Sequence, residues 1–266
     1  MRFYKYIAII LVYRNTYDLI ECINNMKKEI SSLQIIVVNS FYDDSSRREA
    51  EEIALQNGCD FLNIENRGYS YGNNQGIALA RSKYHYDYII IANPDTIVRH
   101  FETPPPGCEV IAPRIVCASG KEQNPMMVVH NPISEKICYW GFKHRIHFLV
   151  LLSIALNKVL RLLFLLFFAK CDSYKIYMPH GSFLLLGKNT VERLSPIYDE
   201  NMFLFAEESV LATRLAELKI DVIYFRGIEI YHKEDGSMNL AHFSLYEELR
   251  KANMYYYETY LKKSKA

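Results

Sequence analysis

Apolar runs and amphipathic segments alternate through the first hundred residues of this 266-residue chain. Short segments that are apolar throughout, such as residues 35–38, are typical of strands buried on both faces of a parallel sheet. Segments with apolar residues three or four positions apart are typical of helices that cover such a sheet. We therefore expect strands at residues 6–12, 33–40, 59–65 and 86–92, and helices at residues 17–30, 46–57 and 73–82. This alternation predicts a parallel sheet with right-handed crossovers, which ends at the three prolines of residues 101–107.

Polar or conformationally permissive residues stand at the ends of all four expected strands. They are Tyr13 and Asn15 for the first strand, Asn39 for the second, Asn66 and Gly68 for the third, and Asn93 and Asp95 for the fourth. Because ligands bind at the carboxyl ends of the strands in an open parallel sheet, this recurrence favours one shared binding site. The alternative is that these are ordinary turn residues.

The segment NRGYSYGNNQGIALARSKYHYDYIIIANPDT, residues 66–96, joins a glycine-rich start to a single carboxylate. Its glycines are four residues apart, which matches neither a P-loop nor a G-x-G-x-x-G fingerprint. This spacing favours close approach of the backbone to a ligand, followed by a helix whose first N–H groups face that ligand. At the other end, Asp95 suits a Mg²⁺ or Mn²⁺ ion, since both prefer oxygen ligands. A turn or helix-capping aspartate is the alternative.

The composition of the chain argues against nucleic-acid binding and against a zinc site. The net charge is +1, so the chain offers no bulk electrostatic attraction for nucleic acid. Its six cysteines are scattered without a C-x-x-C pair, which argues against a zinc site and suits the reduced thiols of a cytosol. The apolar N-terminal run is followed by Arg14 and Asn15 without a small-residue cleavage site, so we interpret it as the first strand.

Several motifs together resemble a known family. The segments NRGYSYGNNQGI and IIIANPDT, followed downstream by HGSFLLLGK, YDENMFLFAEESVLATR, IYHKEDGS and ANMYYYETYLKK, resemble the inverting family-2 glycosyltransferases with a GT-A fold. The similarity is greatest to their rhamnosyltransferase-like bacterial branch. It covers most of the chain except about residues 104–171, and its motifs occur in the expected order.

The resemblance implies roles for particular residues. Asp95 corresponds to the aspartate that holds a divalent metal, Mn²⁺ or Mg²⁺, on the donor diphosphate, and His232 to a further metal or diphosphate ligand. The implied donor-binding residues are Tyr13, Asn15, Asn39, Asn66, Gly68, Gly72, Asn73, Asn74 and Asn93. The implied acceptor-binding residues are His180, Gly181, Asp199 and Glu200.

The same resemblance implies that Glu208, paired with Glu207, is the catalytic base. A sugar hydroxyl has a pKa far above 7, so inversion needs a carboxylate that takes its proton as attack proceeds. Three positions depart from the family pattern, which has aspartate where Asn39 and Glu208 stand and an acid where Val210 stands. The alternative for the glutamate pair is an acidic first turn that complements the N-terminus of a helix over residues 207–219.

Residues 146–170, IHFLVLLSIALNKVLRLLFLLFFAK, are nearly long enough to span a bilayer. However, Lys158 and Arg161 lie in the middle, and Ser153, Asn157 and Arg161 form a narrow polar stripe. A span would also place the donor residues and the glutamate pair on opposite sides of the membrane. We therefore expect one or two helices lying in the membrane interface, with a buried core helix or a dimer contact as alternatives.

The expected architecture is α/β: a GT-A-like, Rossmann-type mixed sheet flanked by helices, with an inserted amphipathic or apolar helical segment. Residues 1–103 would form the nucleotide-sugar-binding half, and residues 104–266 the acceptor-binding and catalytic half of the same domain, including a membrane-associating insertion at about 146–170. The sequence is compatible with a homodimer, and we expect no nucleic acid as a partner.

The expected activity is transfer of a sugar from a nucleoside-diphosphate sugar, dTDP-rhamnose or a UDP-sugar, onto a lipid-linked saccharide. Such an enzyme would serve bacterial cell-surface polysaccharide synthesis, of capsule or O-antigen, as a cytoplasmic protein on the inner face of the plasma membrane. Alternative functions are a nucleotidyltransferase, a non-catalytic relative that binds nucleotide sugar or scaffolds a membrane complex, and a non-enzymatic membrane-surface protein.

Overall fold

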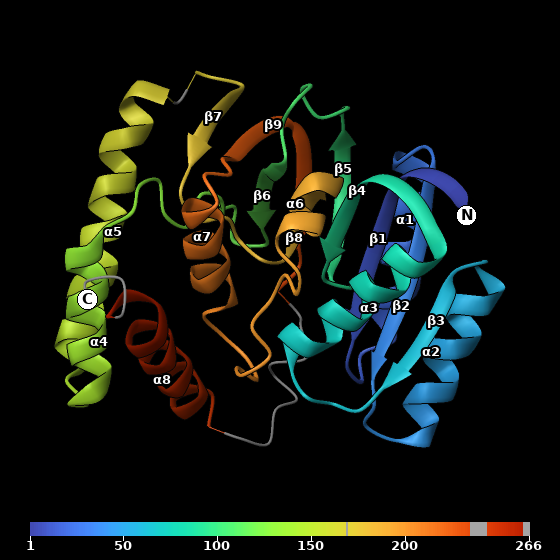
Figure 1. Cartoon of the computed structure of the whole chain (residues 1–266), viewed down its shortest axis with the longest axis horizontal. Coiled ribbons are helices and arrows are strands. Elements are labelled where there is room, and N and C mark those ends of the chain that lie inside the picture. The colour runs from blue at the N-terminus through green and yellow to red at the C-terminus, as the bar shows by residue number, and fades with distance from the viewer. Residues whose placement is uncertain (169, 235–243, 263–266) are drawn as a thin grey trace.

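The computed structural model describes residues 1–168, 170–234 and 244–262 (Figure 1). The strands are β1 (Arg2–Val12), β2 (Leu33–Ser40), β3 (Asp60–Ile64), β4 (Tyr84–Ala92), β5 (Thr96–Phe101), β6 (Val110–Cys117), β7 (Ser173–Ile176), β8 (Phe183–Gly187) and β9 (Val222–His232). The helices are α1 (Tyr17–Glu29), α2 (Asp44–Gln56), α3 (Tyr69–Lys83), α4 (Pro132–Lys143), α5 (His147–Phe168), α6 (Lys188–Arg193), α7 (Glu207–Glu217) and α8 (Leu245–Tyr256), and a π-helical turn, η2 (Tyr257–Leu261), continues α8.

All the strands belong to one mixed sheet in the order β3-β2-β1-β4-β8-β6-β9-β5, with β7 beside β9. The first four are parallel, as predicted, and Ile9 of β1 lies between Ile36 of β2 and Ile91 of β4. The sheet then becomes mixed, because β8 runs antiparallel between β4 and β6. Strand β5 pairs with β9 at the far edge, so a strand from the first hundred residues completes the second half of the sheet.

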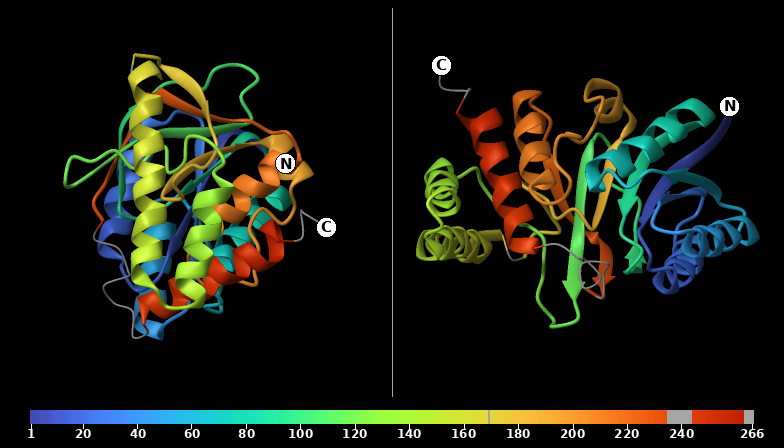
Figure 2. Two further views of the ribbon diagram at one scale, coloured as in Figure 1. Left: turned by 90° about the vertical axis from the view of Figure 1, so that its left-hand side faces the viewer. Right: turned by 90° about the horizontal axis from the view of Figure 1, so that it is seen from below.

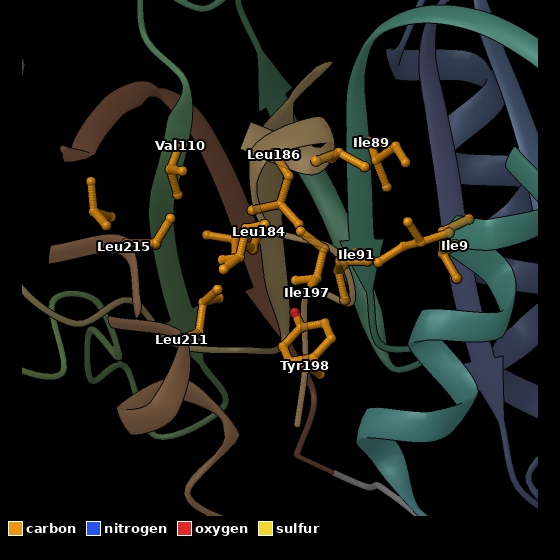
Figure 3. Close-up of a cluster of buried hydrophobic side chains, with 14 of the residues drawn as sticks. Ile9, Ile89, Ile91, Val110, Leu184, Leu186, Ile197, Tyr198, Leu211 and Leu215 are labelled. Carbon is orange, nitrogen blue, oxygen red and sulfur yellow. The ribbon is translucent and has the colours of Figure 1, made fainter. Parts of the chain in front are cut away.

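Helices cover both faces of this sheet, which explains the continuously apolar strands. Side chains such as Ile9, Ile91 and Leu184 point to the face covered by α3, α6 and α7 (Figure 3). Their neighbours Ile10 and Ile90 point to the opposite face, where α1 and α2 pack. Each fully buried side chain of this size contributes roughly 1.5–3 kcal/mol relative to an exposed one. The predicted α/β architecture is confirmed.

Helix α3 begins earlier than the sequence pattern predicts, at Tyr69 rather than Asn73. The glycine-rich stretch is therefore helical rather than an extended loop. A Cβ atom on Gly72 would lie 2.5 Å from Cδ1 of Leu11, and one on Gly76 would lie 2.4 Å from Cγ2 of Ile9. These two glycines thus allow the helix to pack closely on β1.

The C-terminal half adds a layer of helices, α4, α5 and α8, at the end of the molecule farthest from β3 (Figures 1 and 2). The predicted polar stripe of α5 faces the protein. Oγ of Ser134 donates to the carbonyl oxygen of Ser153 (2.9 Å), and Asn157 Oδ1 accepts from Nδ2 of Asn131 (3.0 Å). Further along, Arg161 donates to the carbonyl oxygen of Glu122 (2.7 Å). Helix α5 is therefore held against the body along its length.

The apolar side of α5 faces outward. Its exposed side chains include Phe148, Leu151, Ile154, Leu162, Leu163, Leu166 and Phe167. Among the described residues, α5 is the one helix long and apolar enough to cross a membrane, and only 6% of its most apolar window is buried. The alternative of a helix buried in the core of this chain is therefore wrong.

Candidate active site

One large cavity, of about 800 Å³, opens beside the carboxyl ends of β1 and β4. It brings together ten of the residues that the sequence singled out: Tyr13, Asn66, Gly68, Asn93, Asp95, His180, Gly181, Glu207, Glu208 and His232. These residues are contributed by strand ends, loops and the N-terminus of α7, from both halves of the chain. The two halves therefore meet at a single site.

Asp95 lies in a tight turn directly after β4. The Asn93 N–H donates to the carbonyl oxygen of Ser182 (2.8 Å), and the Thr96 N–H donates back to that of Asn93 (3.2 Å). From the other side, the Lys233 N–H donates to the carbonyl oxygen of Asp95 (3.0 Å). Because the turn is held by the residue before β8 and by the residue after β9, the buried Asp95 carboxylate has a fixed position.

His232 faces Asp95, with Nε2 3.3 Å from Oδ1 of the carboxylate. Its other nitrogen, Nδ1, lies 2.8 Å from Oε1 of Gln123, and Gln123 Nε2 donates to Glu234 Oε1 (2.9 Å). Since the amide donates its N–H to Glu234, its oxygen accepts the proton of Nδ1. In the neutral ring, Nε2 then presents a lone pair to a carboxylate oxygen.

Two electron-rich atoms that face each other in a buried pocket are stabilised by a positive charge between them, which either a proton on Nε2 or a metal ion supplies. A divalent metal fits this pair, because carboxylate and imidazole are both suitable ligands and the Gln123 amide fixes the ring as metal-bound histidines require. Among the described residues, no cluster of three or more His, Cys, Asp or Glu side chains could hold a metal alone. Asp95 and His232 would therefore share it with oxygen atoms of a substrate.

His180 stands beside His232, with ring centroids 5.7 Å apart. The Ser182 N–H donates to Nδ1 of His180 (3.1 Å), so the proton of the neutral ring resides on Nε2. Burial, and secondarily the neighbouring His232, lower the pKa of His180 to about 4. His180 is thus a neutral hydrogen-bond donor in the cavity wall.

Glu207 and Glu208 open helix α7. Glu207 is buried, and its Oε1 makes no hydrogen bond to the described residues, whereas Glu208 is partly exposed to the cavity and its Oε1 accepts from the Gly181 N–H (3.2 Å). Burial and then the adjacent Glu208 raise the pKa of Glu207 to about 8, and burial raises the pKa of Glu208 as well. Because two adjacent buried carboxyl groups disfavour a second negative charge, the pair holds a proton more readily than either group would alone.

The backbone before this pair is strained. Phe205 and Ala206 both have positive φ, 73° and 62°, which is costly for residues with a Cβ and is found mostly where function requires it. Opposite them, a Cβ on Gly181 would lie 2.6 Å from Oε1 of Glu208. The absence of a side chain at Gly181 therefore lets the carboxylate rest against its backbone.

Five predicted donor residues lie outside the cavity lining, and four of them, Asn39, Asn15, Asn73 and Gly72, make structural contacts within the N-terminal half. Asn39 is buried and donates to Oδ1 of Asn63 (2.7 Å), which joins β2 to β3. Asn15 donates to Oδ2 of Asp18 (2.7 Å), while Asn73 donates to the carbonyl oxygen of Tyr69 (3.0 Å). Gly72 packs on β1, as described above.

Three more predicted residues tie the loop before α7 to its neighbours. Asn74 accepts from the Tyr198 N–H (3.0 Å) and donates to Oε1 of Glu200 (2.9 Å). Asp199 accepts from the Tyr260 hydroxyl (2.6 Å). Neither Asp199 nor Glu200 lines the cavity, so the structure does not bring these two predicted acceptor residues into the site. The last part of the IYHKEDGS motif, residues 235–237, lies outside the described residues.

Other residues of the site were not predicted from the sequence. Gln123 lies in the region where the resemblance is weakest, and no motif marks it. Tyr69, whose hydroxyl donates to the carbonyl oxygen of Gly181 (3.0 Å), could have been found from its place beside Gly68. The cavity also extends to α4, α5 and α8, where it is lined by Glu135, Cys138, Tyr139, Ile154, Leu249, Tyr256 and Tyr257.

Comparisons with known proteins agree with this architecture. Residues 7–101 match the sequence model of glycosyl transferase family 2. No curated protein sequence matches the chain. Similar solved structures include GalNAc-T7 with UDP, GalNAc and Mn²⁺ (TM-score 0.59, 11% identity), the mannosyltransferase PcManGT from Pyrobaculum calidifontis with GDP-Man and Mn²⁺ (TM-score 0.53, 13% identity), and TarS of S. aureus (TM-score 0.53, 11% identity).

These alignments cover 86%, 97% and 86% of this chain, respectively. The chain spans 44% of the GalNAc-T7 chain, 71% of the PcManGT chain and 36% of the TarS chain. At such low identity the likeness establishes the fold, which is that of the GT-A glycosyltransferases. The matched family segment, residues 7–101, contains Tyr13, Asn93 and Asp95.

Proposed function

We propose that this protein is an inverting glycosyltransferase that uses a nucleoside-diphosphate sugar and a divalent metal. The observation that carries the proposal is the cavity that contains both the Asp95–His232 pair and the partly exposed Glu208. The Asp95–His232 pair suits the phosphates of a donor, and Glu208 suits the role of a proton acceptor. The family-2 match and the GT-A fold support the same activity.

In this mechanism the acceptor hydroxyl attacks the anomeric carbon from the side opposite the diphosphate. A new carbon–oxygen bond forms, the bond to the diphosphate breaks, and the hydroxyl proton passes to Glu208. The Gly181 N–H and the N-terminus of α7 stabilise the Glu208 charge before the reaction. A protonated Glu207 keeps a second negative charge away from the base.

Asp95 and His232 would hold the metal, Mn²⁺ or Mg²⁺, against the donor diphosphate. When bound, the metal offsets the charge that develops on the departing diphosphate. His180 would donate to a phosphate or sugar oxygen through its Nε2–H. Two of the similar structures, GalNAc-T7 and PcManGT, contain Mn²⁺ together with UDP and GDP-Man, respectively, which supports this assignment.

Tyr13, Asn66, Gly68 and Asn93 remain the proposed donor-binding residues within the cavity. We favour dTDP-rhamnose or a UDP-sugar as the donor, on the resemblance to the rhamnosyltransferase-like branch. The shape of the pocket rather than its motifs sets the preference among sugars.

The outward apolar face of α5 supports a membrane-associated protein with a lipid-linked saccharide as acceptor. Such an enzyme would take its donor from the cytoplasm and work at the inner face of the plasma membrane, in synthesis of a bacterial capsule or O-antigen. A homodimer through the same face is the competing arrangement.

The test is a thermal-shift panel of nucleoside diphosphates and nucleotide sugars with and without Mn²⁺. A ligand that binds only the folded protein raises the melting temperature by mass action. We expect stabilisation by one nucleotide family that depends on Mn²⁺ in the wild type and is lost in Asp95→Ala. Stabilisation that is equal in Asp95→Ala would remove this residue from the metal site, and no stabilisation by any nucleotide would contradict the proposed function.

A further inference from the structure

The catalytic cavity has a second end, which we call the lateral arm: the part lined by Cys138 and Tyr139 of α4, Ile154 of α5, Leu249 of α8, and Tyr257. Helices α4, α5 and α8 lie side by side at the end of the molecule opposite β3 (Figure 2). The proposed reacting groups lie elsewhere in the same cavity: Asp95 after β4, His232 at the end of β9 and Glu208 on α7. The lateral arm therefore extends the cavity beyond the proposed donor-binding and catalytic residues.

The side chains named above make most of the lateral arm apolar. Four polar residues also line this end of the cavity and are hydrogen-bonded within the protein: Ser134, Ser153, Asn157 and Asn253. A thiol, an isoleucine, a leucine and two aromatic rings line the lateral arm, and the ring of Tyr139 stacks on that of Tyr257 with centroids 4.3 Å apart. The polar groups beside them are already engaged with the protein. Glu135 accepts from the Tyr256 hydroxyl (2.9 Å) and from His130 (2.8 Å), and the Tyr139 hydroxyl donates to Glu258 (2.8 Å). Such walls favour a hydrocarbon chain over a sugar.

Ile154 connects this interior surface to the outside. It lines the cavity and is 58% exposed, one turn from Leu151, which is 64% exposed and lies outside the cavity lining. The lateral arm thus reaches the turn of α5 that also carries exposed apolar side chains. A chain that leaves the cavity there would continue along an apolar face rather than into water.

From this continuity we infer that the lateral arm binds the hydrocarbon chain of a glycolipid acceptor, which enters from the side of α5 while its sugar reaches Glu208. The inference rests on the proposed function and adds the place of the acceptor's chain. Isoprenoid chains and acyl chains are both apolar hydrocarbons. They differ in branching, so the branching that the lateral arm accepts distinguishes between them.

The test measures binding of alkyl glucosides of increasing chain length to the full chain by calorimetry, below their micelle concentrations and without membranes. Each methylene that enters the lateral arm contributes ~0.8 kcal/mol, so affinity should rise about fourfold per methylene. Isoprenyl glucosides of equal carbon number form the second series. The series with the steeper slope identifies the kind of chain.

Two matched variants place a charge on α5 at exposed positions that tolerate it. Ile154→Glu, in the cavity lining, should remove the dependence on chain length, whereas Leu151→Glu, outside the cavity lining, should keep it. A wild type without chain-length dependence, or equal loss in both variants, overturns the inference. Because Mn²⁺-dependent nucleotide binding is measured separately, its survival in that case would leave the glycosyltransferase proposal standing.

Discussion

Helix α1 packs its apolar face against the protein, whereas helix α5 packs its polar stripe against the protein. In α1 the apolar residues Leu19, Ile23 and Met26 are buried on the sheet, and the polar side faces outward. In α5 only Ser153 is buried, while Leu166 and Phe167 are 77% and 81% exposed. The first arrangement is how a helix covers a core in water, and the second suits a helix whose outer side meets an apolar partner.

The two regions of the molecule around α1 and α5 differ in the same way. Around α1, the first four strands form a compact sheet that delivers Tyr13, Asn93 and Asp95 to the cavity. Around α5, the helical layer provides a wall of that cavity and a large apolar surface. The site lies where the two regions meet, so donor binding, proton transfer and surface attachment should be separable by substitution.

The largest expected effect comes from Glu208→Gln, which keeps the shape of the side chain and removes the proposed base. Because a positioned base contributes roughly 10²–10⁴-fold, sugar transfer should fall by that factor while Mn²⁺-dependent donor binding persists. Transfer is measured with the donor found in the thermal-shift panel. Glu217→Gln, at an exposed position of the same helix, should transfer normally. If Glu207→Gln alone has the large effect, the base is Glu207.

The sequence predicted the first region better than the second. Continuous apolar strands such as β2 have one stable environment, between two layers of helices, so their pattern determines their place. The start of α3 was missed because glycine and asparagine disfavour helices locally, whereas the packing of Gly72 and Gly76 on β1 compensates in the folded protein.

For α5, the periodicity of the sequence predicted the polar stripe, but not whether this stripe faces the protein or the outside. That direction depends on contacts from Ser134, Asn131 and the carbonyl of Glu122, which are far away in sequence. Gln123 was missed for the same reason, because its role arises only when β9 brings His232 beside it. The motifs of the site were therefore visible, while the residues that orient them were not.

The next prediction concerns the α5 surface. Leu162→Ser combined with Leu166→Ser should weaken binding to vesicles of phosphatidylethanolamine and phosphatidylglycerol by about 10²-fold, since each leucine loses ~1.5 kcal/mol of apolar burial. Cosedimentation measures it, and Leu55→Ser, an equally exposed apolar position on α2, serves as the control. If the wild type does not bind vesicles but forms dimers, and the double variant does not form dimers, this face contacts a second copy of the chain instead.

A smaller effect tests the buried pair. The pKa of Glu207 is raised in the folded protein, so the unfolded chain loses this proton first as the pH rises from about 4.5 to about 8. The free energy of unfolding should therefore decrease across this range. In Glu207→Gln this decrease should be smaller by about 2 kcal/mol, because Glu207 shares the proton with Glu208 in the wild type. Denaturant unfolding at both ends of the range measures it. An identical pH dependence in wild type and variant would show that Glu207 is ionised when folded.

The smallest expected effect concerns Gln123, which orients His232 from a loop between the two regions. Gln123→Leu removes the acceptor for Nδ1–H, so the ring is free to turn or to change tautomer. Substitutions of this kind weaken metal binding by 10–100-fold, and we expect about tenfold here because water can replace the amide. Mn²⁺ titration by calorimetry measures the affinity without requiring turnover, and Gln56→Leu on α2 is the control. Unchanged Mn²⁺ affinity in Gln123→Leu, together with a loss in His232→Ala, would mean that Asp95 and the surrounding backbone hold the ring in place without the amide.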